Sequence, residues 1–147
     1  MRYIGGTHSD GIFYSKNDPV ELFGYTDSDW AGDTVERKST SSYAFCIHSD
    51  VFSWSSKKQQ VIALFTAEAK YIATANSATQ PLWLRRTLGV LQHKQVDPAK
   101  IYCDSKSAIE LSKNLVLHGC SKHIDIKYHF IRELVREREI EVDYCRT

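Results

Sequence analysis

The sequence predicts one α/β domain spanning residues 1–147. A chain of 147 residues with 42% hydrophobic and 25% charged content can form one core that buries about 70% of its unfolded surface. Short β-branched and aromatic runs fill the N-terminal part, and helical periodicity begins at Thr66. Strand patterns return between later helical stretches, so the predicted order is three strands, helix, strand, two helices and strand.

The N-terminal strands are predicted from runs of aromatic and β-branched residues. Gly11–Tyr14 and Val20–Thr26 are separated by a cluster of turn-forming residues and should pair as strands. Ser42–Ile47 and Val51–Ser55 flank His48–Asp50, a link whose length suits a β-hairpin. Together these four runs predict an antiparallel N-terminal region that supplies the first three strands of the predicted order.

The first helix should begin near Thr66, where alanines follow at helical spacing. Thr66 is a candidate N-cap, and Glu68 places a negative charge in the first turn, where the helix dipole favours it. The apolar pattern continues past Pro81, which would cost about 3 kcal/mol inside a regular helix. We therefore expect a kink there or two consecutive helices.

The C-terminal half should supply two strands and two helices. Ile101–Cys103 is predicted to be a buried strand, and Ser105 is placed to cap the helix that follows, so Asp104 lies in a β-to-α turn. A stripe of apolar residues at helical spacing predicts an amphipathic helix over Lys122–Glu137. Ile140–Tyr144 alternates between apolar and polar residues, as a half-buried strand does.

Composition excludes several classes of protein. The formal net charge of +1 gives no overall basic signal, so attraction to a polyanion would have to be local. No apolar run approaches the roughly 20 residues of a membrane-spanning helix, and no membrane partner is expected. The four cysteines lack CxxC spacing and no secretory leader follows Met1, so we expect reduced thiols and an intracellular location, in the cytoplasm or nucleus.

Two aspartates at predicted strand ends form the candidate metal site. Asp27 lies in the acidic, turn-forming run Tyr25–Gly32, and Asp104 directly follows Ile101–Cys103. Carboxylates from separate elements can converge on one divalent cation. Aspartate is also favoured in turns and at helix N-caps, so the two residues alone leave a structural role open.

Several longer motifs occur in one order along the chain: Tyr25–Gly32, Arg37–Ser41, Ser53–Gln59, Trp83–Arg86 and Lys122–Arg132. In this order they closely resemble the ribonuclease H domain of copia-type LTR retrotransposon Pol polyproteins. The match covers nearly the whole chain, and the succession of motifs makes it more specific than any single triplet. The resemblance implies a ribonuclease H-like fold with a mixed five-stranded sheet and flanking helices.

The resemblance also implies an endonuclease that cleaves the RNA strand of an RNA:DNA hybrid with two divalent cations, Mg²⁺ or Mn²⁺. Such ions hold the scissile phosphate, generate hydroxide from water and stabilise the leaving oxygen. Magnesium takes few carboxylates and keeps waters and phosphate oxygens as its other ligands. The implied partners are the hybrid and a reverse transcriptase domain in the same polypeptide, whose connecting segment residues 1–15 resemble.

Carried over by position, Asp27 and Asp104 match two of the family's metal-binding carboxylates. The helical glutamate of the family's Thr-x-Glu-Ala-Glu-Tyr motif falls on Lys70. Glu68 should not replace it, because two residues along a helix rotate a side chain by about 200°. We expect the two aspartates to share a cleft in which Lys70 forms an ion pair with one of them and takes the place of metal.

A fourth carboxylate of the family comes from an Ala-Asp pair shortly after the last strand, and the sequence stops at Thr147 before such a pair. Two of the four expected ligands are thus absent from the sequence, so we expect hybrid cleavage to be impaired or lost. The alternative hypotheses are a domain that binds the hybrid without cleaving it and a transposon fragment without a present function.

Two basic, polar stretches, Arg37–Thr40 and Ser55–Gln60, are candidate nucleic-acid contacts. Their cations, hydroxyl groups and amides are of the kind that contact phosphates and 2′-hydroxyls without reading sequence. They could equally be solvated hairpin ends, and the resemblance favours backbone contacts. The candidate residues are Arg37, Lys38, Ser39, Ser55, Ser56, Lys57 and Lys58.

A zinc site is a further alternative for His118–His123 together with Cys145, since histidine and cysteine at short spacing can bind this metal. The spacing matches no standard paired motif. Polar capping at a helix start is a sufficient explanation for these histidines, and we favour it.

Overall fold

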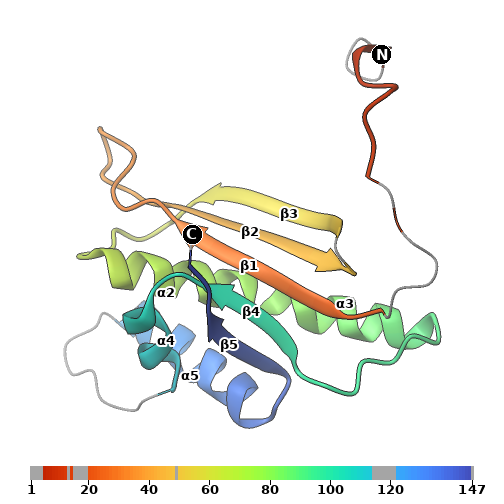
Figure 1. The fold of residues 1–147 in the computed structure, drawn as a ribbon. Coiled ribbons are helices and arrows are strands. Elements are labelled where there is room, and N and C mark those ends of the chain that lie inside the picture. The colour runs from red at the N-terminus through yellow and green to blue at the C-terminus, as the bar shows by residue number, and fades with distance from the viewer. Residues whose placement is uncertain (1–4, 13, 15–19, 49, 114–121, 147) are drawn as a thin grey trace.

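The structure, a computed structural model, describes residues 5–12, 14, 20–48, 50–113 and 122–146, and for residues 122–128 it describes the backbone alone. Within these residues the fold is a mixed five-stranded sheet with flanking helices, as the sequence predicts (Figure 1). The strands are β1 (Leu22–Ser28), β2 (Thr40–Ile47), β3 (Asp50–Lys58), β4 (Ala99–Cys103) and β5 (Ile140–Tyr144).

The sheet has the strand order β3-β2-β1-β4-β5, with β1 at its centre. β1 and β3 each pair with β2 in antiparallel fashion, whereas β1 with β4 and β4 with β5 are parallel. Because β1 and β4 run the same way, their carboxyl ends meet at the same edge of the sheet. This edge contains Asp27 and Asp104.

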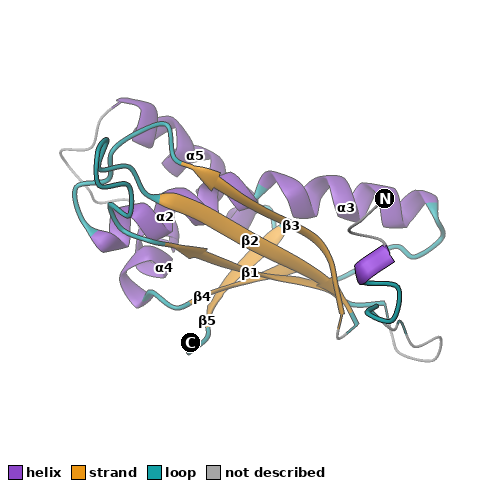
Figure 2. Ribbon diagram, turned by 90° about the horizontal axis from the view of Figure 1, so that it is seen from above, coloured by secondary structure: helices purple, strands orange, loops and turns teal. Residues whose placement is uncertain are grey.

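The helices are α2 (Thr66–Ser77), α3 (Thr79–Val90), α4 (Lys106–Lys113) and α5 (Lys122–Arg136). Seen from above, α2, α3 and α5 lie on the same side of the sheet (Figure 2). α2 packs across β1 and β2, and α4 packs against α2, α5 and β5. The core between α2 and the sheet contains the fully buried side chains of Tyr71, Ile72, Phe45 and Ile101.

The predicted pairing of Gly11–Tyr14 with the first strand is wrong. Residues 11, 12 and 14 are not in a strand, and Ile12 and Tyr14 are about half exposed. β1 already has β2 on one side and β4 on the other, so its backbone hydrogen bonds are taken and it has no free edge for another strand.

The start of α2 also differs from the prediction. Thr66 is its first helical residue, and the N-cap position belongs to Phe65, whose side chain makes no capping hydrogen bond. The predicted interruption near Pro81 is confirmed as two helices, α2 and α3, which meet at Ala78. Pro81 lies in the first turn of α3, where its missing N–H has no helical partner to lose.

The predicted amphipathic helix near the C-terminus is confirmed as α5. Its stripe turns toward the core at Ile131, which is fully buried, and at Val135, which packs against the core cluster. The other two stripe residues, Ile124 and Tyr128, have side chains outside the described set. Among the helices that the structure describes, none has both the length and the apolar content needed to cross a membrane.

Candidate active site

Asp27 and Asp104 lie side by side at one edge of the sheet. Thr26 and Cys103 are register partners in the parallel pair β1–β4, and each is followed by one of these aspartates, Asp27 within β1 and Asp104 directly after β4. Both carboxylates contact the same nitrogen atom, the Nζ of Lys70, at 2.8 and 2.6 Å. The prediction that two carboxylates from adjacent strands converge is therefore confirmed.

Lys70 reaches this carboxylate pair from α2. Its ammonium contacts Oδ1 and Oδ2 of Asp104, both at 2.6 Å, and Oδ1 of Asp27 at 2.8 Å. The predicted ion pair is confirmed, and it involves both aspartates rather than one. The Lys70 side chain is only 13% exposed, compared with 20% for Asp104 and 58% for Asp27. We call these three residues the triad.

The charges of the triad stabilise one another. Burial alone would raise the pKa of Asp27, but hydrogen bonds from Lys70 and from the Ser28 N–H, with the nearby ammonium charge, lower that pKa below its ordinary value. Burial would lower the pKa of Lys70, and its hydrogen bonds to Asp104 and Asp27 raise it instead. Asp27 and Lys70 therefore both stay charged at neutral pH.

The residues of the triad do not fit a divalent metal. Magnesium requires oxygen ligands in near-octahedral geometry, and here an ammonium group donates its N–H bonds to the oxygens that would bind the ion. Across the described ranges, no group of three or more His, Cys, Asp and Glu side chains is placed to hold a metal. The site thus contains a cation supplied by the chain itself.

Glu68, two residues before Lys70, has a different partner. It is buried, and its Oε2 accepts a hydrogen bond of 2.6 Å from the backbone N–H of Leu64. The carboxylate thus satisfies the N–H of a residue that directly precedes α2 and its N-cap Phe65, and ties the entering chain to the first turn of the helix. Its direction confirms that Glu68 does not replace the glutamate expected at position 70.

Gln59 holds the start of α2 against the sheet, a role that the sequence did not reveal. Its buried amide nitrogen lies 2.9 Å from the carbonyl oxygen of Ala69, 2.8 Å from Ser41 Oγ and 3.2 Å from Ser28 Oγ. A side-chain amide has two N–H donors, so it can satisfy two of these three acceptors at a time. The contacts tie β1 and β2 to the residue that precedes Lys70.

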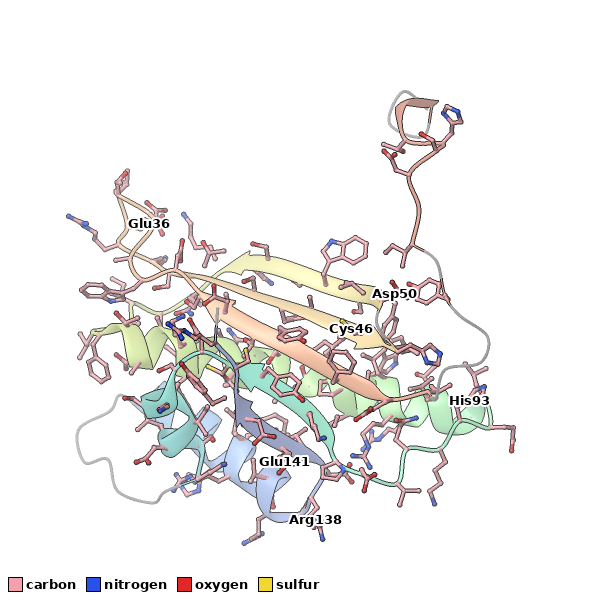
Figure 3. The ribbon with its side chains drawn as sticks, viewed as in Figure 1. Glu36, Cys46, Asp50, His93, Arg138 and Glu141 are labelled. Carbon is pink, nitrogen blue, oxygen red and sulfur yellow. The ribbon has the colours of Figure 1, made fainter. Side chains whose placement is uncertain are left out.

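The loop between β1 and β2 contains the first group of predicted nucleic-acid contacts. Figure 3 shows Glu36 in this loop, beyond the end of the sheet opposite to Cys46 and Asp50. Arg37 is exposed, and Lys38 pairs with Glu36 at 2.7 Å. The prediction of Ser39 as a nucleic-acid contact is wrong. Ser39 is fully buried, and its hydroxyl accepts a hydrogen bond from the Ala31 N–H, so it does not belong to a binding surface.

The second group of predicted contacts lies along β3. Ser55, Lys57 and Lys58 line a groove of about 340 Å³ between the sheet edge and α2, and Ser56 is exposed beside them. Lys58 forms an ion pair with Asp33, which raises the Lys58 pKa and lowers that of Asp33. The other residues that line the groove are Ser41, Tyr43, Gln60 and Asn76. We call it the β3 groove.

A second hollow, of about 240 Å³, adjoins the triad. Asp27 and Asp104 line it, together with Tyr25 and Tyr102, whose rings stack with centroids 5.4 Å apart. Tyr43 lines both this hollow and the β3 groove. Side chains alternate between the two faces along a strand, so Ser41, Ser55 and Lys57 of the β3 groove lie on the face that α2 covers. Tyr25 and Ser42 of the second hollow lie on the opposite face of the sheet.

The zinc alternative falls largely outside the described residues. Residues 118–121 are not described, and the side chains of Lys122 and His123 are not described either. Cys145 is half-buried, Cys46 and Cys103 are buried, and all three have free thiols. The zinc hypothesis stays untested.

The sequence is similar to part of several transposon polyproteins. It is 44% identical over 142 residues to the retrovirus-related Pol polyprotein from transposon TNT 1-94 of Nicotiana tabacum. It is 38% identical over 147 residues to those from transposons RE1 and RE2 of Arabidopsis thaliana. These matches cover 97–100% of the chain, which spans about a tenth of the length of each relative. No family model matches the chain.

The fold is similar to solved ribonuclease H structures. The N-terminal RNase H domain of a Mycobacterium tuberculosis protein gives a TM-score of 0.60 at 15% identity and covers 86% of this chain and 83% of that one. LC11-RNase H1, solved with an RNA/DNA hybrid, gives 0.56 at 15% identity and covers 86% of both. A foamy viral protease-reverse transcriptase, also solved with a hybrid, gives 0.59 at 13% identity and covers 93% of this chain and 19% of that one.

Proposed function

Because this chain is a ribonuclease H-like domain homologous to part of the retrovirus-related Pol polyproteins of transposons, we propose that it binds an RNA:DNA hybrid without cleaving it. The single observation that supports the loss of cleavage is the position of Lys70 between Asp27 and Asp104. The copia-type motifs of the sequence fit this assignment.

The positive charge of Lys70 opposes metal binding by electrostatic repulsion. Two-metal hydrolysis needs divalent ions at carboxylates to bind the phosphate and to activate water. In this chain, an ammonium within 2.8 Å of both aspartates is where such an ion would bind. At a separation of about 4 Å and an effective dielectric constant of about 20, two unit charges interact by about 4 kcal/mol. Repulsion of this size is enough to exclude Mg²⁺ or Mn²⁺.

The composition of the β3 groove supports hybrid binding. Lys57 and Lys58 place cations along the β3 groove, and Ser55 and Asn76 add a hydroxyl and an amide. These groups suit the phosphates and 2′-hydroxyls of a nucleic-acid backbone. Structural neighbours of this chain have been solved with RNA/DNA hybrids, which supports the same ligand class here.

We also propose that the domain acts beside a reverse transcriptase in a longer polypeptide. The Pol polyproteins to which the chain is homologous are about ten times its length. The foamy viral neighbour has a protease and a reverse transcriptase in the same chain as the matched domain. A polymerase placed there would deliver the hybrid that this domain binds.

A gel assay on an end-labelled RNA:DNA hybrid, with Mg²⁺ or Mn²⁺, tests the proposed loss of cleavage. The unaltered chain should give no product, whereas Lys70→Glu should gain some metal-dependent cleavage because it restores a third carboxylate. Lys70→Glu combined with Asp27→Asn should lose that activity again. If the unaltered chain cuts as fast as Lys70→Glu, then Lys70 does not block the site and the proposal is wrong.

Fluorescence anisotropy with the same hybrid tests binding. We expect saturable binding that weakens linearly in log Kd with log salt, since phosphate contacts release counterions. Duplex DNA of the same length should compete less well than unlabelled hybrid. If the chain shows no saturable binding even at low salt, the alternative of a fragment without function is favoured.

A further inference from the structure

The net charge of the triad differs sharply from that of the site expected from the resemblance. Two carboxylates and one ammonium give Asp27, Asp104 and Lys70 a net charge of −1. A glutamate at position 70 would give the metal-free site a net charge of −3. Its three carboxylates would repel one another and would also repel a phosphate backbone. In this chain one of the two negative charges of the aspartates is neutralised before any ion binds.

The ammonium of Lys70 is also fully used within the site. A lysine has three N–H donors, and three carboxylate oxygens lie within 2.8 Å of this one. Its side chain is mostly buried, and Gln59 and Glu68 fix the start of the helix from which it extends. Lys70 therefore acts on the aspartates rather than as a direct phosphate ligand.

We propose that Lys70 is a built-in counterion that makes both the stability of this site and its binding of hybrid independent of divalent metal. The stability part rests on the triad geometry alone, and the binding part rests on the proposed function. In the metal-dependent arrangement, the cation comes from solution and leaves when it is chelated. In this chain the cation is covalently attached, so chelation removes nothing.

The test compares the unaltered chain with Lys70→Glu in EDTA and in millimolar MgCl₂ at matched ionic strength. For the unaltered chain, the midpoint of thermal unfolding and the Kd for labelled hybrid should be the same in both buffers, within about twofold for Kd. For Lys70→Glu, MgCl₂ should raise the midpoint, and EDTA should weaken hybrid binding by about tenfold because the charge of its site is two units more negative. In the binding assay, we expect CaCl₂ to restore hybrid binding by Lys70→Glu as MgCl₂ does.

Two further variants keep the result interpretable. Lys94→Glu makes the same charge change at an exposed residue that lines a different hollow, near the end of β1 remote from Asp27, and it should behave like the unaltered chain. Lys70→Gln leaves the two aspartates unneutralised without adding a third carboxylate. It should respond to MgCl₂ in the same direction as Lys70→Glu but less strongly, and it serves as the readout if Lys70→Glu does not fold.

The outcomes separate this inference from the proposed function. If the unaltered chain gains stability with MgCl₂, or binds hybrid only in its presence, the counterion role is overturned while hybrid binding stands. If the chain binds no hybrid but MgCl₂ leaves its unfolding midpoint unchanged, the proposed function fails and the counterion role in stability is supported. If Lys94→Glu responds to MgCl₂ as Lys70→Glu does, the effect is one of net charge and the inference is wrong.

Discussion

Lys70 and Lys57 are the same residue type in two settings, and the settings give them opposite uses. Lys70 is mostly buried, and its ammonium is held by two carboxylates at the end of the sheet. Lys57 is exposed along the β3 groove, and no carboxylate contacts it among the residues that the structure describes. The comparison teaches that the neighbouring carboxylates decide whether a lysine is available to a phosphate.

Lys58 lies between these extremes. Its side chain is half exposed, yet it forms an ion pair with Asp33 in the loop between β1 and β2. An exposed pair of this kind contributes little to stability, because water and salt screen it. The pair does compete with an external phosphate for the same ammonium. Substitutions at each of the three lysines test whether their neighbouring carboxylates set these different roles.

The largest effect should come from Lys70→Met, which removes the ammonium and leaves two carboxylates facing each other. Losing one partner of a buried ion pair costs about 3–5 kcal/mol, and we expect about 2 kcal/mol here because water reaches Asp27. Urea unfolding of both proteins in EDTA measures the difference. Lys94→Met is the matched control and should change stability by no more than about 0.5 kcal/mol. Equal decreases in the free energy of unfolding for Lys70→Met and Lys94→Met would mean that the ion pairs of the triad do not stabilise the fold.

The size of that difference should depend on pH in a defined direction. The pKa of Asp27 is lowered from 3.8 on folding, so its contribution is present above about pH 3.8 and is lost as pH falls through the folded value. The pKa of Lys70 is raised from 10.5, so its contribution is present below that pH and is lost as pH rises through the folded value. Unfolding curves of the unaltered chain and Lys70→Met should therefore differ most between these limits and converge in acid. A gap that stays constant below pH 3.8 would contradict the ion-pair explanation.

A smaller effect is expected from Lys57→Ala, which removes an available cation from the β3 groove. Hybrid binding should weaken by about threefold to fivefold at low salt, and the slope of log K against log salt should fall by about 0.9, as expected for one lost phosphate contact. Stability should barely change, because the side chain is exposed. Anisotropy titrations at several salt concentrations give both numbers. An unchanged slope would remove Lys57 from the binding surface.

The smallest effect should come from Lys58→Ala, because Asp33 already engages this ammonium. We expect hybrid affinity to fall by no more than about twofold. The reverse change sharpens the point: Asp33→Asn frees Lys58 and should tighten binding slightly in the same titration. If Lys58→Ala weakens binding more than Lys57→Ala does, pairing with Asp33 is not what limits Lys58.

The sequence was most informative where a functional position repeats a known pattern. Asp27, Asp104 and Lys70 were identified by their places in motifs, and parallel pairing of β1 with β4 then brings them together. The prediction gave Lys70 an ion pair with one aspartate, and the structure shows contacts with both. The number of contacts depends on how α2 is seated on the sheet, which local sequence does not specify.

The sequence was least informative where a polar side chain has a distant partner. Ser39 looks like a surface hydroxyl in its run of basic residues, yet it is buried against the Ala31 N–H. Gln59 follows exposed lysines and turns inward to the Ala69 carbonyl. Gly11–Tyr14 has a strand-like composition, but its predicted partner β1 already pairs with β2 and β4. In each case non-local packing overrides a local preference.

A single base change could reverse the charge that residue 70 brings to the site. Lysine and glutamate codons differ only in their first base, so a single transition at the codon for residue 70 exchanges the built-in cation for a third carboxylate. Because Glu68 and Gln59 anchor α2 without help from residue 70, that mutation would change the charge of the site and leave the helix in its register. Copies of this sequence that differ at that base would form a natural series of metal-dependent and metal-independent sites on one fold.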